Sequence, residues 1–574
     1  ADGEASVATE AAATGLSGGD GNDWLDLSGG LTGGATATSK ARNVQVGAAG
    51  ALLGGADNGA SATVAALDGG DGNDVLRLAG STNLSAAASG TAGNTTVTVA
   101  GLGNASATSE NRASAFGLLG GAGDDSLTAT GTLTLGATAS QSASSRSITI
   151  LGAAAAKGGL FAAAEGSFLD GGAGNDFLFV AGAFLRLTGS SSVSANSATV
   201  NIAGSAASRG LARAETTLAG FAGGAGNDRI LFTGDARLNA LASITQTGSA
   251  FTLTGAATQG GDVRARATAT GISGGADDDL VDQGGILAVE AGSTSTTSSS
   301  SYALAGFGGG AIGLGADALA VGIDAGDGVN DLRAGGTTTV LARATGRLNS
   351  NVTVTFGATG DDKAPAGTVA TARGLRGGSG ADTVSGAGFL RASAIADTGF
   401  TSTKFVTFGT SGGNSNAIAT ADSIGIEAGA GDDSVAFAGT LETFAEATTK
   451  GNGAAGATIG NTTSASEAVA RPRATALSTG AGADDVALGG TSSTSLIATA
   501  RSQNSVTTGA LFSDGIARSR ARTDYLGSLL LDAGGDTHVL LSGAHTLRIQ
   551  GDLGDFRGLT RTDAVSRGVS SGID

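Results

Sequence analysis

The chain of 574 residues has no cysteine and no methionine, only two prolines and two histidines, and only 4% aromatic residues. The lack of cysteine excludes disulfides, thiol chemistry and cysteine metal sites. His538 and His545 both lie near the C-terminal end, so we expect neither a histidine-based catalytic triad nor a zinc site. No run of about 18 apolar residues occurs, which argues against a membrane span.

Charge is also scarce, and it is mostly of one sign. Charged residues make up 14% of the chain, and the net charge is −18. This balance argues against nucleic acid or an anionic membrane as partners and favours cations. Paired acids such as Asp124/Asp125 and Asp432/Asp433 lie inside repeated turns and not in one unique cluster. We therefore expect no enzyme.

The N-terminal residues 1–17 contain no basic segment followed by an apolar one, so they do not form a signal peptide. Without an initiating methionine, the chain is expected to be a processed product or a segment of a longer protein.

Glycine is abundant, at 102 of 574 residues, and it recurs in one stretch down the chain. The best copies read GGDGNDWLDL from Gly18, GGDGNDVLRL from Gly69, GGAGDDSLTA from Gly120, GGAGNDFLFV from Gly171 and GGAGNDRILF from Gly223. Looser copies begin at Gly274, Ala325, Gly377, Ala428 and Thr479, and a degraded one begins at Ala533. The copies start 51 or 52 residues apart, with a last interval of 54. Such a period is typical of a repeat array.

Three further positions recur in each repeat. The eighth position is always Leu, Ile or Val, from Leu25 to Val486, and the twelfth is always glycine, from Gly29 to Gly490. A third glycine ends a middle strand in most repeats, at Gly50, Gly101, Gly152, Gly255, Gly306, Gly357, Gly409 and Gly460. We divide the chain into a partial repeat at 1–17, ten tandem repeats at 18–532 forming one continuous solenoid, and a partial repeat at 533–574.

Alternating β-branched segments such as TVTVAG, which ends at Gly101, predict strands, and helix signals are nearly absent. We expect four strands per repeat, joined by Gly/Ser/Asn turns. Stacked coils need the same backbone conformation at the same corner, and glycine supplies it. The fold class predicted is all-β, a parallel β-solenoid with one glycine-rich turn per repeat. A β-propeller is the alternative, but ten complete repeats exceed its usual four to eight blades. A roll with more than one coil per repeat also stays open.

The turn resembles GGxGxDxUx, the calcium-binding nonapeptide of RTX (repeats-in-toxin) proteins. The resemblance covers about nine residues in every 51, whereas RTX nonapeptides usually run in tandem. It implies a bacterial protein, export by a type I secretion system, and Ca²⁺ in the turns.

The residue types also suit calcium, which takes six to eight oxygen ligands at about 2.3–2.6 Å. Carboxylates at the sixth position and carbonyls of the glycine-rich turn supply such oxygens, and an ion between stacked turns would take ligands from both. The other interpretation is that these stretches serve as turns alone. The predicted calcium ligands are Gly18, Asp20, Asn22, Asp23, Gly69, Asp71, Asn73, Asp74, Gly120, Asp124, Asp125, Gly171, Asn175, Asp176, Gly223, Asn227, Asp228, Asp279, Asn330, Asp382, Asp432, Asp433 and Asp484.

The function expected is structural: a secreted, calcium-stabilised solenoid of the bacterial cell surface that assembles head to tail into a filament or surface layer. The partners expected are other copies of the chain and a cell-surface polysaccharide. The two partial repeats, and acids near the N-terminus opposite arginines near the C-terminus, favour joined ends. The alternative is an adhesin stalk or an ice- or surface-binding module of a longer RTX protein. For ice binding, the feature considered is a row of outward threonines, such as Thr98, Thr149 and Thr252.

Overall fold

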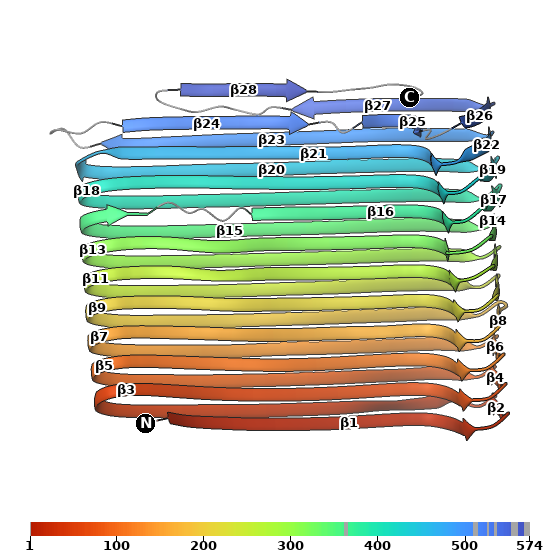
Figure 1. Cartoon of the computed structure of the whole chain (residues 1–574), viewed down its shortest axis with the longest axis horizontal. Helices are drawn as coiled ribbons and strands as arrows, with labels where there is room; N and C mark the ends of the chain where they lie inside the picture. Colours follow the sequence, from red (N-terminus) through yellow and green to blue (C-terminus); the bar gives the residue numbers. More distant parts are fainter. Residues whose placement is uncertain are drawn as a thin grey trace.

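The protein is a flat stack of parallel β-strands (Figure 1). The computed structural model describes residues 2–360, 366–508, 515–524, 527–532, 536–552 and 561–567. Within these ranges every regular element is a strand. The described residues contain no helix that is long and apolar enough to cross a membrane.

Each of the first repeats forms one long strand and one short strand. For example, β5 (Ser81–Ala122) has 42 residues, and β6 (Ser126–Ala129) follows it after the glycine-rich turn. The long strand reverses direction at Gly101, where φ is 121°. It therefore consists of a first arm before the bend and a second arm after it. Figure 1 shows the bends at one end of the stack, and the turns and short strands at the other.

Strands of the long type make up a 17-stranded sheet in the described chain. They are β1 (Asp2–Asp20), β3 (Leu31–Asp71), β5, β7 (Thr132–Ala173), β9 (Phe184–Ala225), β11 (Asp235–Ala276), β13 (Ile286–Gly326), β15 (Thr337–Thr359), β16 (Ala366–Ser379), β18 (Phe389–Ala430), β20 (Thr440–Ile459), β21 (Thr462–Ala481), β23 (Thr491–Thr508), β24 (Gly515–Asp524), β25 (Gly527–Asp532), β27 (Ala544–Asp552) and β28 (Arg561–Arg567).

The short strands form a second sheet of 11 strands in the same ranges. They are β2 (Trp24–Leu27), β4 (Val75–Leu78), β6, β8 (Phe177–Val180), β10 (Arg229–Phe232), β12 (Leu280–Gln283), β14 (Asp331–Ala334), β17 (Thr383–Gly386), β19 (Ser434–Phe437), β22 (Ala483–Leu488) and β26 (Asp536–Leu541). The eighth-position Leu/Ile/Val column lies in this sheet, and Leu76, Leu127 and Leu178 of that column have no exposed surface.

The register confirms a parallel solenoid with one coil per repeat. Thr98 of β5 pairs with Thr149 of β7, and Thr149 pairs with Asn201 of β9. Each partner is thus one repeat further along the chain. This register excludes both the propeller and a roll with several coils per repeat.

The prediction of four strands per repeat was wrong. The alternating segments merge into one long strand, because hydrogen bonds to the neighbouring coils continue past the bend. The bend glycines have φ between 99° and 138°, a region that side chains disfavour. Gly204, with φ 130°, is a ninth bend glycine that the sequence pattern did not include.

The interior between the two arms changes character along the coil. Near the turns it holds leucines and the rings of Phe168, Phe221 and Phe232, which contact one another at tilted angles. Towards the bends it holds small and polar residues that bridge the arms. For example, the Ser295 hydroxyl donates to the Gly315 carbonyl at 2.6 Å. Small side chains therefore allow the two layers to approach closely.

The middle-strand threonines point into this interior. Thr98, Thr149 and Thr252 are at most 1% exposed. The outward row of threonines considered for ice binding is therefore wrong, because the alternation places these residues on the inner face of the arm. The outward positions beside them carry Val99, Ile150 and related side chains.

The bend should tolerate no side chain. An ideal Cβ on Gly255 would lie 1.7 Å from the Gly204 carbonyl oxygen, and φ at Gly255 is 124°. We expect Gly255→Ala to cost about 1–3 kcal/mol in backbone strain, beyond the clash, and to raise hydrogen exchange in the coils on either side. Gly367→Ala is the matched control, since a Cβ there meets no atom within 4 Å. Equal exchange in the two variants would contradict this account of the bend.

Candidate functional site

The candidate site is the column of glycine-rich turns that joins long strands to short ones. Glycines at the second and fourth positions have φ between 87° and 146°. Asp277 takes the fourth position in its repeat with φ 75°, the one non-glycine residue with positive φ among those described. The turns therefore keep one backbone shape in every coil, which brings equivalent side chains into register.

The sixth position forms a continuous hydrogen-bonded ladder. The Oδ1 of Asp74 accepts a bond from the backbone N–H of Asp23 in the preceding coil, at 2.7 Å. The same bond joins Asp74 to Asp125, Asp125 to Asp176, Asp176 to Asp228, Asp228 to Asp279, Asp279 to Asn330, Asn330 to Asp382, Asp382 to Asp433 and Asp433 to Asp484, at 2.7–3.1 Å. Asn330 occupies its rung with an amide oxygen, so the ladder does not require a charge at every position.

The fifth position forms a second ladder, in which the donating N–H belongs to the next coil and not to the preceding one. The Asn22 side-chain oxygen accepts from the Asn73 N–H of the next coil at 2.9 Å, and Asn73 accepts from Asp124 at 3.0 Å. The same hydrogen bond, at 2.7–3.0 Å, is accepted by the side-chain oxygens of Asp124, Asn175, Asn227, Asp278 and Asp432. These side chains lie on the exposed side of the turn, as do Asp20 and Asp71 at the third position. The structure thus separates the predicted ligands into a buried column and an exposed group.

The second carboxylate oxygen of the sixth position is buried and has no hydrogen-bond partner. This holds for all nine aspartates of the column: Asp23, Asp74, Asp125, Asp176, Asp228, Asp279, Asp382, Asp433 and Asp484. Apart from Asp23 in the first turn, they are only 1–3% exposed. A buried carboxylate oxygen without a partner is costly, and here the cost recurs in coil after coil.

The first glycine of the turn leaves room for this oxygen. An ideal Cβ on Gly69 would lie 2.5 Å from both Asp74 Oδ2 and the Gly120 carbonyl oxygen of the next coil. Gly18, Gly120, Gly171 and Gly223 have the same two neighbours at 2.3–2.6 Å. The first glycine is therefore needed because the carboxylate and a carbonyl of the next coil occupy the space of its side chain.

Burial of the column changes its acidity. It raises the pKa of Asp176 and Asp279 to about 7, and that of Asp125, Asp228 and Asp433 to about 6. A bond from the neighbouring backbone N–H partly offsets this rise, and nearby carboxylates add to it. The column consequently favours whatever neutralises it, a proton or a cation.

The oxygens fit a hard cation such as Ca²⁺, with one restriction. No group of three or more acidic, histidine or cysteine side chains converges anywhere in the described part of the chain. An ion in the column would thus draw on the carboxylates of successive turns, and on backbone carbonyls or water for the remaining ligands. The residues that would hold it are the nine sixth-position aspartates and the first-position glycine carbonyls.

Acids just before the turn are already paired in two repeats. Arg376 contacts Asp324 at 3.2 Å and Glu427 at 3.8 Å, and Arg373 contacts Glu427 at 3.2 Å. These two acids therefore already have arginine partners. The two ladders and these ion pairs could not be found from the sequence, because they depend on which residues face each other across coils.

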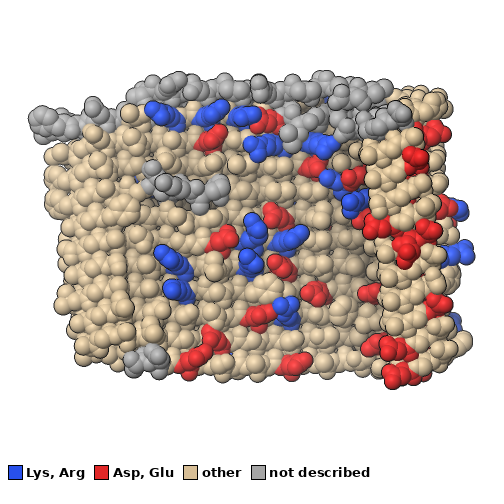
Figure 2. Space-filling view, in the orientation of Figure 1, with Lys and Arg blue, Asp and Glu red and all other residues tan. Residues whose placement is uncertain are grey.

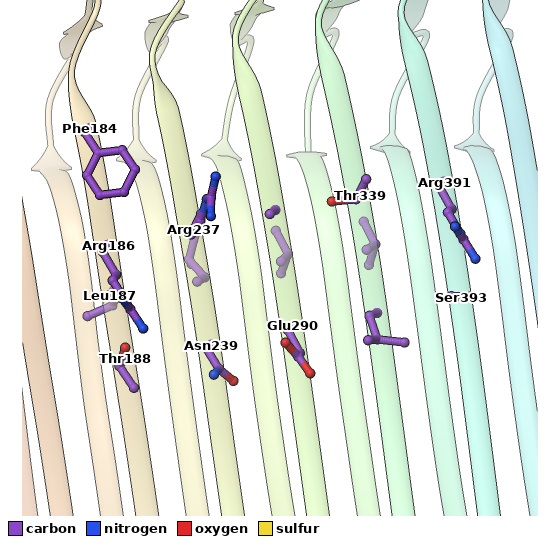
Figure 3. Close-up of a pocket in the computed structure, with 15 residues that line it drawn as sticks. Phe184, Arg186, Leu187, Thr188, Arg237, Asn239, Glu290, Thr339, Arg391 and Ser393 are labelled. Carbon is purple, nitrogen blue, oxygen red and sulfur yellow. The ribbon is translucent and has the colours of Figure 1, made fainter.

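A shallow groove of about 550 Å³ lies on the first arms near the short strands (Figure 3). It is lined by Phe184, Arg186, Arg237, Glu290 and Arg391, among others. Arg237 pairs with Asp235 at 3.3 Å, and Arg391 lies 3.8 Å from Glu442. Because these partners balance two of the three arginines, the groove is only a weak candidate for an anion site.

Comparison with known proteins gave no match to a family model, to a curated protein or to a solved structure. The likeness to RTX proteins therefore rests on the turn motif alone.

The raised pKa values predict a pH dependence in the absence of calcium. The folded pKa values of about 6–7 exceed the ordinary 3.8, so the folded chain binds protons more tightly than the unfolded chain. That stabilisation is complete below about pH 4 and is lost as the pH rises through about 7. We expect a lower urea midpoint at pH 8 than at pH 5, with calcium removed on a chelating resin before the pH is set. A midpoint that stays constant or rises would contradict the buried column.

Proposed function

We propose that this protein is a structural, calcium-stabilised β-solenoid that functions outside a bacterial cell and assembles head to tail into a filament or surface layer. The observation that carries the proposal is the column of nine buried carboxylate oxygens without partners, one in nearly every coil. Neutralising such a column with cations would turn an unfavourable stack of like charges into a stabilising one.

A location outside the cell is supported by the calcium concentration that such a chain would need in order to fold. Calcium-binding modules of extracellular proteins bind at about 10⁻⁴–10⁻³ M, so a chain of this kind would fold fully only where calcium is plentiful. The likeness of the turns to RTX nonapeptides supports export from a bacterium in the same way. Repetition of one turn along a stack supports a mechanical role better than a catalytic one, since catalysis needs a unique cluster.

Head-to-tail assembly is supported by the stacking itself. Each long strand pairs in parallel with the long strand of the next coil in the same register, so a coil of another copy can add in the same way. Strand β1 contains Asp2, Glu4 and Glu10, whereas β24, which lies near the other end between β21 and β28, contains Arg518, Arg520 and an Arg522 that is paired with Asp524. Opposite charges would set the polarity of a junction. We leave a polysaccharide partner out of this proposal, because two of the three groove arginines have acidic neighbours.

The test removes one carboxylate from the column while keeping the hydrogen bond that its side chain accepts from the neighbouring coil. Asp176→Asn retains an oxygen that can accept from the Asp125 N–H, as Asn330 does for Asp279 at 2.9 Å. We expect calcium, but not magnesium, to raise the unfolding temperature of the native chain and to yield filaments in electron micrographs. Asp176→Asn should bind fewer calcium ions in calorimetric titration, because it removes a carboxylate ligand from the ion positions between this turn and the turns on either side.

The matched control is Asp262→Asn, which removes an exposed acid on a long arm. This variant should bind as much calcium as the native chain. Absence of binding at millimolar calcium, or an equal loss in the two variants, would refute the calcium proposal. Calcium binding without filaments would refute the assembly alone.

A further inference from the structure

An apolar strip runs along the bend end of the stack, opposite the turns. We define it as the outward residues from six positions before to three positions after the bend glycine in the first nine coils. Nineteen of the 32 large apolar side chains that are exposed in the described chain lie in this strip. They are Val44, Val46, Leu53, Val99, Leu102, Ile148, Ile150, Leu151, Val200, Ile202, Phe251, Leu253, Tyr302, Leu304, Phe307, Phe356, Phe405, Phe408 and Ile459. An exposed apolar patch of this extent marks an interaction surface.

The side chains of the strip form regular columns. In one column Val200, Phe251 and Tyr302 pair in register in successive coils and are 39–48% exposed. In a neighbouring column the rings of Phe356 and Phe408 stack with centroids 4.9 Å apart and planes at 4°. The strip is therefore a ridged surface with the repeat distance of the solenoid itself.

The strip carries almost no charge. Its nine segments contain only Arg146 and Lys404, and Lys404 is 1% exposed. Figure 2, which shows the second arms, has no charged residue at the bend end, whereas acidic residues gather at the turn end. A net charge of −18 makes copies of the chain repel one another in most orientations, and contact through the strips keeps the acidic turn ends furthest apart.

We propose that the strip is a lateral interface with a second copy of this chain, packed strip to strip about a twofold axis. The occupant is a second copy because its ridges have the same spacing and can interdigitate along the whole length. Nine coils at about 4.8 Å give a length of about 40 Å, and six extended residues give a width of about 20 Å. The resulting area of about 800 Å² per partner is that of a standard stable interface. The contact lies at the end of the coil away from the turns, and it uses neither the residues of the carboxylate column nor those of the head-to-tail junctions.

A twofold interface brings the middle of the strip against itself, which cysteine crosslinking can detect. The chain has no cysteine, so a single substitution gives an unambiguous readout. Phe251 lies in the fifth of the nine coils and is 43% exposed, and Leu241 lies in the same strand outside the strip and is 39% exposed. Under mild oxidation we expect Phe251→Cys to form disulfide-linked dimers at low micromolar concentration. Leu241→Cys should remain uncrosslinked under the same conditions.

Mass measurements on the full chain give the second readout. Sedimentation in millimolar calcium should show the native chain as laterally paired rolls, or as filaments two rolls wide in micrographs. The double variant Ile148→Lys/Phe251→Lys should give single rolls, and Leu241→Lys should stay paired, with circular dichroism checking that each variant folds. Native rolls that stay single at about 100 µM, equal crosslinking of the two cysteine variants, or capture of the strip by neutral lipid vesicles without self-pairing would overturn the proposal. This experiment measures the width of the assemblies and not their length. A failure of lateral pairing can therefore be distinguished from a failure of head-to-tail assembly.

Discussion

Stacking identical turns in register places one carboxylate above another at the spacing of β-strands, about 4.8 Å, and the rest of the structure depends on how this column is accommodated. The backbone satisfies one oxygen of each carboxylate, because Oδ1 in one coil accepts a hydrogen bond from a backbone N–H of the preceding coil. The other half, Oδ2, lies buried beside a glycine without a partner. The turn therefore carries a buried carboxylate oxygen without a partner in nearly every coil, and a proton or a cation from solution would neutralise it.

Thin layers make this register possible along the whole coil. Two arms of about 20 residues can face each other only because alanine, serine and threonine fill most of the space between them, with larger side chains near the short strands. Each coil then ends in two different ways. One end is a charged turn, and the other is an uncharged glycine bend with outward Val, Ile and Phe side chains. A flat roll with unlike ends therefore offers separate surfaces for the axial and the lateral contacts that we propose.

Much of this architecture could be predicted from the sequence, because it follows from period and composition. The 51-residue spacing of Gly18 and Gly69, the column from Leu25 to Val486, and the bend glycines indicate one solenoid coil per repeat. The sequence also groups the sixth-position aspartates, and the structure aligns all nine in one column in which every residue except Asp23 is buried.

Other features could not be predicted. The alternation near Thr98 does not reveal which face is inward, so the threonines were placed on the wrong side. The continuity of the long strands depends on pairing with other coils, which a single repeat does not encode. The separation of the fifth position from the sixth also depends on the direction in which each side chain bonds across coils, as Asn22 and Asp74 illustrate.

The most direct test is anomalous X-ray diffraction from crystals of the chain grown in calcium. The account predicts a row of calcium peaks along the sixth-position aspartates, one coil apart, with weaker or missing peaks beside Asn330, where the column lacks a carboxylate. Well-ordered turns without any peak next to Asp74, Asp125 or Asp176 would contradict it, as would calcium peaks confined to the exposed acids.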